Sequence, residues 1–340
     1  RRSAGADPWP EAEAALNAPI RGLIALAALL AGFVSSPTTP GATAAPPDIA
    51  ATSWALIDAR TGESLGQKAG NRRLPMASTT KMMTAYLALR NLRMDEVVRA
   101  VDYQGAPAES LMGLEAGQRV SVRDLLYGLT LLSGNDAAVT LATAVSGTVP
   151  RFVALMNRTA RRLGLSNTSY ENPIGLDGDR QYSSARDLAR LGRSLMAIPR
   201  YRPIAAARTA TLRSFRPPVE IETGNEFVRD YPWAIGIKTG FTNLAGYILA
   251  SDGRRRATEL IASVMGTSSE AARDAETAEL MNYGFSLDDQ RVPVGSGRPV
   301  ERIPVRLEDR DLPGCSTRPV RIGVREGEPL GVTPDVREEV

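Results

Sequence analysis

Lysine and histidine usage limits the chemistry available to this chain. It contains 38 arginines but only three lysines, and it has no histidine. Lys81 ends the run Ser78-Thr79-Thr80-Lys81, and Lys238 begins Lys238-Thr239-Gly240. Arginine stays protonated at working pH, whereas a lysine removed from water can lose its proton. Without histidine, Ser-His-Asp and Cys-His mechanisms and a histidine-ligated zinc site are excluded. If a serine is activated here, a lysine must act as its base.

The spacing of Ser78 and Lys81 suits a shared site. Residues three apart on a helix lie on one face, about 5–6 Å apart at Cβ. A serine in the first helical turn also lies near free backbone amides and the positive end of the helix dipole. Taken alone the pattern is weak evidence, because a chain of this length contains it about once by chance. A helix cap followed by an extended surface lysine is the simpler interpretation.

Two further motifs carry polar side chains at suitable places. Ser133-Gly134-Asn135 interrupts two apolar helical segments, where it can present a hydroxyl and an amide into a cleft or form an ordinary turn. Lys238-Thr239-Gly240 lies on a strand-like run, so Lys238 and Gly240 face one side and Thr239 the other. Gly240 would let another backbone approach closely. In isolation the Lys-Thr-Gly motif is typical of a surface strand.

The elements that must position these motifs follow from hydrophobic periodicity and capping signals. The expected strands are 53–58, 63–67, 246–250 and 260–264, with turns at 60–62 and 252–253. Helices are expected to begin at 78, at Ser121 with Asp124 as a capping partner, at about 136, at Ser184 and within 267–270. The arginines at 254–256 are expected in a solvated turn. Strands at both ends with helices between them predict an α+β fold with an antiparallel sheet.

The three motifs in this order form the signature shared by penicillin-binding proteins and class A β-lactamases. The chain resembles the low-molecular-mass penicillin-binding proteins, which are serine D-alanyl-D-alanine carboxypeptidases of peptidase family S11. The resemblance covers about residues 49–285. Its matching stretches are 75–84, 132–137, 172–176, 183–189 and 236–247. It implies a β-lactamase/transpeptidase-like architecture with flanking helices and an all-helical lobe.

The resemblance also implies a mechanism. Ser78 is expected to attack the penultimate D-Ala carbonyl of a peptidoglycan pentapeptide stem, and Lys81 to take its proton. Lys81 must then be neutral, which requires lowering a pKa near 10.4 by roughly three units, or about 4 kcal/mol. Burial and the charge of Lys238 both act in that direction. β-Lactams are expected to acylate the same serine as covalent inhibitors.

The remaining roles are also carried over from the family, motif by motif. Ser133 is expected to relay a proton to the leaving amine, and Asn135 to fix Lys81 and the substrate backbone. Lys238, Thr239 and Gly240 are expected to bind the substrate at its terminal carboxylate. The backbone amides of Ser78 and Phe241 are expected to form the oxyanion hole. No cofactor or metal is expected, and a formal charge of +3 gives no reason to expect nucleic acid binding.

Three domain assignments follow. Residues 1–44 are expected to be a signal peptide with an upstream extension, because Arg21 precedes the apolar run 22–34 and Ala42-Thr43-Ala44 fits a cleavage site. This predicts export to the periplasm or the exterior of the cell envelope. Residues 45–290 are expected to form the catalytic domain, and 291–340 part of a small β-rich domain that contains the only cysteine, Cys315. The amphipathic helix that often anchors such enzymes peripherally to the membrane is not expected within 291–340.

Three other functions remain open from the sequence. A class A β-lactamase needs a glutamate-activated water and usually a Ser-Asp-Asn triplet. Here Glu171 precedes Asn172 without a Glu-x-x-Leu-Asn pattern, and the triplet contains Gly134. A D,D-endopeptidase acting on cross-bridges shares all three motifs. The third is a non-catalytic penicillin-binding or structural wall protein, which would be labelled covalently by a penicillin but would not turn over a peptide substrate.

Overall fold

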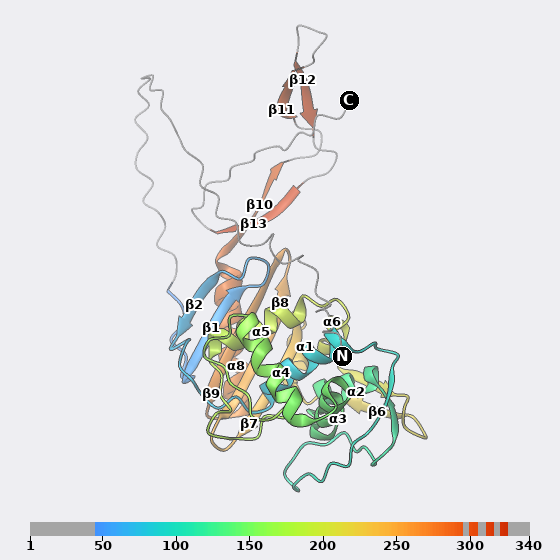
Figure 1. The fold of residues 1–340 in the computed structure, drawn as a ribbon. Coiled ribbons are helices and arrows are strands. Elements are labelled where there is room, and N and C mark those ends of the chain that lie inside the picture. The colour runs from blue at the N-terminus through green and yellow to red at the C-terminus, as the bar shows by residue number, and fades with distance from the viewer. Residues whose placement is uncertain (1–44, 295–298, 305–310, 316–319, 326–340) are drawn as a thin grey trace, which may run out of the picture. The chain divides into compact units, whose positions relative to one another are not determined.

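The chain folds around a five-stranded antiparallel sheet with the strand order β2-β1-β9-β8-β7 (Figure 1). The computed structural model describes residues 45–294, 299–304, 311–315 and 320–325, so the expected signal peptide at 1–44 lies outside the described residues. The strands of the sheet are β1 (Ser53–Asp58), β2 (Ser64–Lys68), β7 (Ala234–Thr242), β8 (Gly246–Arg255) and β9 (Thr258–Thr267). The prediction of an antiparallel α+β fold is confirmed.

Strand β1 joins the N-terminal hairpin of this sheet to its C-terminal strands. It pairs with its hairpin partner β2 and with β9, which follows it by about two hundred residues, Trp54 lying opposite Val264. Alternate residues of a strand face opposite sides. Accordingly Trp54 and Leu56 pack beneath α8 (Glu270–Ser286), while Ala55 and Ile57 belong to the larger core shared with the other helices. The sheet is therefore buried on both faces.

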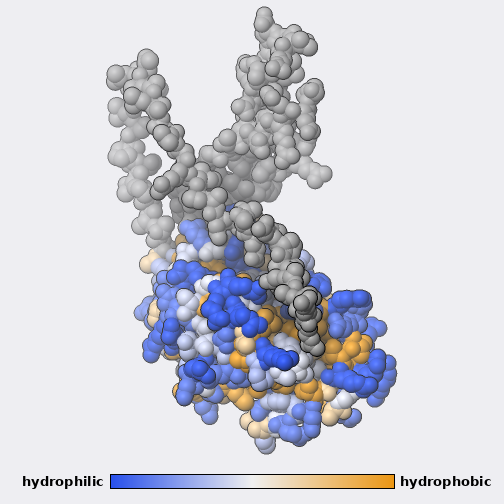
Figure 2. All heavy atoms as spheres, in the orientation of Figure 1, coloured by the Kyte–Doolittle hydropathy of each residue, from blue (hydrophilic) through white to orange (hydrophobic). Residues whose placement is uncertain are grey.

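The remaining helices lie between β2 and β7 in sequence, and those that share the larger core form the lobe that packs on the second face. The remaining helices are η2 (Ala77–Thr80), α1 (Lys81–Asn91), α2 (Val122–Leu131), α3 (Asn135–Ser146), α4 (Val149–Arg162), α5 (Ala185–Met196), α6 (Arg202–Ala205) and α7 (Glu226–Asp230). The last of them packs instead on the α8 side of the sheet, where Phe227 contacts Leu249 and Ala278. Two small two-stranded sheets interrupt these helices: β3 (Val97–Arg99) with β4 (Arg119–Ser121), and β5 (Thr209–Leu212) with β6 (Val219–Glu222). Outside, hydrophilic side chains cover much of the visible face, with apolar patches between them (Figure 2).

The capping signals read from the sequence are confirmed. The Ser121 hydroxyl accepts a hydrogen bond from Asp124 N at 3.1 Å, and the Ser184 hydroxyl accepts one from Asp187 N at 3.3 Å. Helix α8 is capped by Ser269, within the expected segment 267–270, and runs three residues beyond the expected end. Such caps depend only on groups three residues apart, so the local sequence is sufficient to specify them.

The predicted turn at 252–253 is wrong. Asp252 and Gly253 lie inside β8, opposite Ile261 and Leu260, and the turn to β9 comes after Arg255. Gly253 serves packing instead, because a Cβ there would lie 2.7 Å from the Trp233 ring. The expected solvated arginine turn is reduced to Arg256, which has a φ of 53°. The Arg255 guanidinium lies 4.8 Å from the centroids of both the Trp233 and Phe285 rings, a cation–π arrangement that holds the strand end in place.

Beyond α8 the described segments are strands, as expected for a β-rich region. β10 (Asp288–Val294) pairs with β13 (Val320–Arg325), and β11 (Pro299–Pro304) pairs with β12 (Asp311–Cys315). The division at residue 290 stays a prediction. Within the described ranges, no single helix has both the length and the apolar character to cross a membrane; α3 and α4 pass that test only as a pair bent by 83°.

Candidate active site

The first motif places its serine and lysine in direct contact. Lys81 Nζ donates hydrogen bonds to Ser78 Oγ at 2.8 Å and to the Ile174 carbonyl at 2.7 Å. Ser78 lies in the 3₁₀ turn η2, which leads directly into α1 at Lys81. Residues three apart nearly eclipse in a 3₁₀ turn, which brings the two side chains together. The three-residue spacing of the motif therefore identified the pair correctly.

The environment of Lys81 favours a neutral amine. Its side chain is 1% exposed. Burial first, and the positive charge of Lys238 second, lower the pKa of Lys81 well below its usual range, while Glu109 and Asp136 act in the opposite direction. A buried ammonium loses its hydration, so the uncharged form is favoured. A neutral amine within hydrogen-bond distance of a serine hydroxyl can act as a general base.

A loop from the helical lobe fixes the other side of Lys81. The Asn172 side-chain oxygen accepts hydrogen bonds from the backbone amides of Ile174, Gly175 and Leu176, the bond to Gly175 being 2.7 Å long. This turn directs the Ile174 carbonyl toward Lys81. Gly175 has a φ of +100°, and a Cβ on it would lie 1.9 Å from the Ala77 carbonyl oxygen. The loop is therefore in backbone contact with the turn that carries Ser78.

Ser133-Gly134-Asn135 connects α2 to α3. Ser133 has a φ of 60°, a left-handed conformation that non-glycine residues rarely adopt. Asn135 is 5% exposed, its backbone amide donates to the Ser110 carbonyl at 2.8 Å, and its side-chain nitrogen donates to Glu109 Oε2 at 2.6 Å. The next residue, Asp136, accepts hydrogen bonds from the backbone amides of Met112, Gly113 and Leu114. These bonds hold the segment 109–114 against the second motif.

The third motif packs on the first. Lys238, Thr239 and Gly240 lie on β7, and a Cβ on Gly240 would lie 3.1 Å from Ser78 N. The close approach expected of Gly240 is present, and the neighbour is the nucleophile turn. Strand β7 is the last in the sheet order, so one edge has no neighbouring strand in that sheet. Phe241, the residue after Gly240 on β7, is half exposed, with its ring against that of Tyr247.

Lys238 is a second buried lysine. It is 3% exposed, and its Nζ donates to the Thr239 carbonyl at 3.0 Å. Burial, with a smaller contribution from the charge of Arg273, lowers the pKa of Lys238 to about 7. Arg273 is itself buried on α8 and is held by Asp274 and Glu270. The charged form of Lys238 is therefore disfavoured until an anion reaches it.

Sequence reasoning missed three groups at this site. Glu109 lies in a loop outside every motif, and only the structure brings it to Asn135. Ile174 acts through its backbone carbonyl, so its side-chain type carries no signal. Arg273 is followed by acidic residues on a helix, a pattern more typical of exposed ion pairs.

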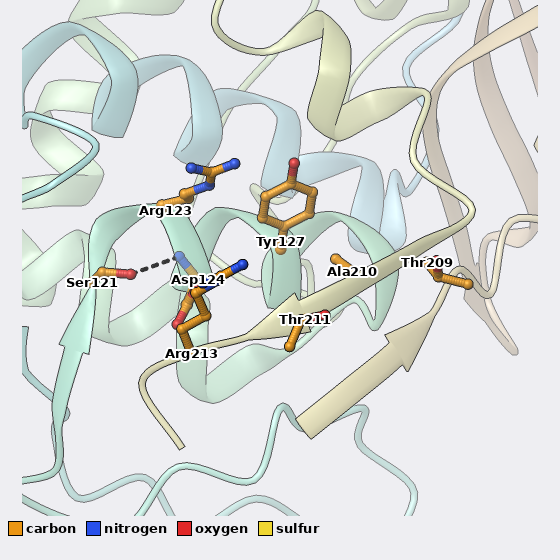
Figure 3. A pocket seen from close by; sticks show the side chains of 8 residues that line it. All are labelled: Ser121, Arg123, Asp124, Tyr127, Thr209, Ala210, Thr211 and Arg213. Carbon is orange, nitrogen blue, oxygen red and sulfur yellow. Dashed lines mark hydrogen bonds between the residues drawn. The ribbon is translucent and has the colours of Figure 1, made fainter. Parts of the chain in front are cut away.

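A separate cavity lies away from these motifs. It has a volume of about 410 Å³ and opens between α2 and β5 (Figure 3). Its lining residues are Ser121, Arg123, Asp124, Tyr127, Thr209, Ala210, Thr211 and Arg213. None belongs to the three motifs, so the candidate active site is defined by the contacts of Ser78, Lys81 and Gly240 and not by this cavity.

An antiparallel sheet with a helical lobe, a serine–lysine pair on a buried turn and a Lys-Thr-Gly strand against it define a penicillin-binding serine enzyme. The model of the D-alanyl-D-alanine carboxypeptidase family, peptidase S11, matches residues 40–269. The chain belongs to this family. It is accordingly a serine-type D-alanyl-D-alanine carboxypeptidase, a hydrolase that acts on peptidoglycan and binds β-lactams, and the family resemblance inferred from the motifs is confirmed.

Named relatives support the same assignment. The chain is 31% identical over 297 residues to D-alanyl-D-alanine carboxypeptidase DacF of Bacillus subtilis (strain 168), covering 85% of this chain and 76% of the relative. It is 35% identical over 278 residues to DacA of Escherichia coli (strain K12), covering 78% and 68%. The crystal structure of DacD from Francisella tularensis superposes with a TM-score of 0.69 at 28% identity and covers 83% of each chain. A serine-to-alanine mutant of the Streptomyces K15 DD-transpeptidase gives 0.67 at 33% identity, covering 71% of this chain and all of the other.

Proposed function

We propose that Ser78 is the nucleophile that removes the terminal D-alanine of peptidoglycan pentapeptide stems, with Lys81 as its base. The observation that carries this assignment is the 2.8 Å hydrogen bond from a buried Lys81 amine to the Ser78 hydroxyl. The pKa of that amine is lowered chiefly by burial. In this state the lysine can accept the hydroxyl proton as the oxygen attacks.

Acylation proceeds in two parts. The Ser78 oxygen forms a bond to the penultimate D-Ala carbonyl carbon, and its proton passes to Lys81. The carbonyl oxygen becomes an oxyanion held by the backbone amides of Ser78 and Phe241. Collapse of this intermediate breaks the peptide bond, and the terminal D-alanine leaves after Ser133 relays a proton from Lys81 to its amine. Asn135 holds the substrate backbone during these steps.

Deacylation repeats the proton transfers with water. Lys81 again accepts a proton, now from a water molecule that attacks the ester carbonyl. The intermediate collapses, the bond to Ser78 breaks, and the serine oxygen recovers its proton. The products are a tetrapeptide stem and a regenerated enzyme.

Selection of a free chain end is assigned to the third motif. Lys238 and Thr239 bind the terminal carboxylate, and Gly240 allows β7 to approach the nucleophile turn. An arriving carboxylate places an opposite charge beside Lys238, which favours its protonated form. Arg273 adds a second positive charge near this position. A substrate whose terminal carboxylate is blocked would leave Lys238 without an anionic partner.

We also propose that the enzyme acts outside the cytoplasm, in the periplasm or on the exterior of the cell envelope. Support comes from the leader pattern at 21–44 and from the location of mature peptidoglycan. Removal of pentapeptide ends decreases the donors for cross-linking, so a contribution to cell shape follows from the same activity.

The decisive experiment combines labelling with product analysis. Ser78→Ala should abolish covalent labelling by a fluorescent penicillin, and labelled Ser78→Ala protein would refute the nucleophile. Mass spectrometry of a muropeptide mixture should show loss of one D-alanine from pentapeptides. Conversion of cross-linked dimers to monomers would instead identify a D,D-endopeptidase.

A further inference from the structure

The loop preceding the second motif brings a carboxylate to Asn135. Glu109 Oε2 accepts hydrogen bonds from Asn135 Nδ2 at 2.6 Å and from the Tyr103 hydroxyl. Its other oxygen, Oε1, accepts one from Ala106 N at 3.1 Å. Both oxygens are therefore engaged, and the carboxylate links the loop at 103–109 to the motif. No role for Glu109 follows from the three motifs.

The contact fixes which end of the Asn135 amide meets the loop. An amide has a donor end, Nδ2, and an acceptor end, Oδ1, whereas an ionised carboxylate only accepts. Because Glu109 engages the donor end, the acceptor oxygen is directed to the opposite side. A hydrogen bond to a charged partner is about twice as strong as a neutral one, so this orientation is firmly held.

The charge of Glu109 also acts on the base. Three charged groups act on Lys81: Lys238 on β7, Asp136 on α3 and Glu109 on its loop, where Glu109 also accepts a hydrogen bond from the titratable Tyr103. Lys238 lowers the pKa of Lys81, whereas Glu109 and Asp136 raise it. The carboxylate of Asp136 already receives four backbone amides. Glu109, in contrast, binds an active-site side chain directly.

We propose that Glu109 is a positioning residue for acylation: it orients the Asn135 amide and stabilises Lys81 in the cationic state that follows proton transfer from Ser78. This inference rests on the proposed roles of Ser78 and Lys81. A neutral amine must be available to start the reaction, and an ammonium must be tolerated halfway through it. Burial favours the first state, and a nearby fixed carboxylate favours the second.

A purely structural role would be limited to holding the loop. In that case Tyr103 and Glu109 would matter equally, because both belong to the same hydrogen-bonded cluster. Burial first, and the hydrogen bond to Glu109 second, raise the pKa of Tyr103, so it remains a neutral donor. Tyr103→Phe removes one loop contact while leaving the Glu109 charge and its bond to Asn135. It is the matched control for Glu109→Gln, which keeps the shape and removes the charge.

The test measures the second-order rate of acylation by a fluorescent penicillin as a function of pH, using the full chain. Glu109→Gln should shift the acidic limb of the profile to lower pH, since Lys81 loses a neighbour that favours its protonated form. Glu109→Ala should reduce the plateau rate by about 10- to 100-fold, the usual effect of losing a hydrogen bond to a charged group. Tyr103→Phe should leave the position of the limb unchanged.

Two results would overturn the proposal. One is a Glu109→Gln profile that superimposes on that of the parent enzyme, and the other is a limb that moves equally in Tyr103→Phe. The isosteric Gln variant keeps the test valid if the Ala variant fails to fold, which thermal unfolding reports. The Ser78→Ala variant distinguishes failure of the proposed function from failure of the positioning role. If Ser78→Ala protein is labelled, the proposed function is rejected. If Ser78→Ala is unlabelled but the Glu109 variants acylate like the parent, only the positioning role is rejected.

Discussion

Replacing Gly175 with alanine tests how strongly the 172–176 loop positions the nucleophile. The added Cβ would lie 1.9 Å from the Ala77 carbonyl oxygen and 2.9 Å from Ser78 N. The oxygen would have to move by about 1.5 Å to reach an ordinary contact distance. A displacement of about 1 Å at reacting groups can cost about 10²-fold in rate. We therefore expect Gly175→Ala to lower the acylation rate by a factor of about 100 or more.

Acylation by a fluorescent penicillin measures this loss, and Gly164→Ala is the control. Gly164 also has a positive φ, +69°, but a Cβ there would have nothing within 4 Å. That variant carries only the left-handed strain, about 1–2 kcal/mol, and should lower Tm slightly while acylating at the parent rate. A folded Gly175→Ala enzyme that acylates like Gly164→Ala would refute the idea that this contact sets the position of Ser78.

Three further outcomes follow from the buried charges. Lys81→Arg should lower acylation by about 10²–10⁴-fold because guanidinium keeps its proton, and a rapidly labelled Arg variant would contradict the base assignment. The KM for a D-Ala-D-Ala peptide should rise as pH increases through about 7, where Lys238 loses its charge. In Lys238→Arg this rise should move to higher pH. A KM profile unchanged in this variant would count against binding of the substrate carboxylate by Lys238. The side chain of Asp252 is fully buried, and its pKa is raised, first by burial and second by the charge of Glu259. The folded state therefore keeps a proton on Asp252 at pH values above about 4, where the unfolded state has released it. The free energy of unfolding of the parent therefore declines as pH rises, whereas that of Asp252→Asn lacks this decline. In denaturant unfolding, the variant should be more stable than the parent at pH 8, and its gain in stability should be smaller at pH 5. An equal gain at both pH values would exclude this linkage.

The sequence was most informative where one local interaction determines the structure. The caps at Ser121 and Ser184 need only a hydroxyl and an amide three residues away, and both were predicted. The prediction at Asp252-Gly253 failed because an Asp-Gly pair is a turn signal only when no tertiary contact competes. Here the Trp233 ring occupies the space beside Gly253, and the strand continues.

For the candidate site, the motifs identified side chains but not the groups that orient them. Ser78, Lys81 and Gly240 meet as their spacing and type suggested. The second partner of Lys81 is a backbone carbonyl 93 residues away, and every residue except proline offers the same two backbone groups. Glu109 was missed for a related reason, since a single acidic residue in a loop reads as solvated surface until a long-range contact is known.

The scarcity of lysine has a practical consequence for handling the enzyme. Amine-reactive esters need a side chain that solvent can reach, and Lys81 and Lys238 are 1% and 3% exposed. Lys68, whose side chain is 43% exposed, lies on β2, at the opposite edge of the sheet from β7. Besides the terminal amine, a dye or a solid support would therefore couple at one defined point, leaving the nucleophile turn open to soluble muropeptides.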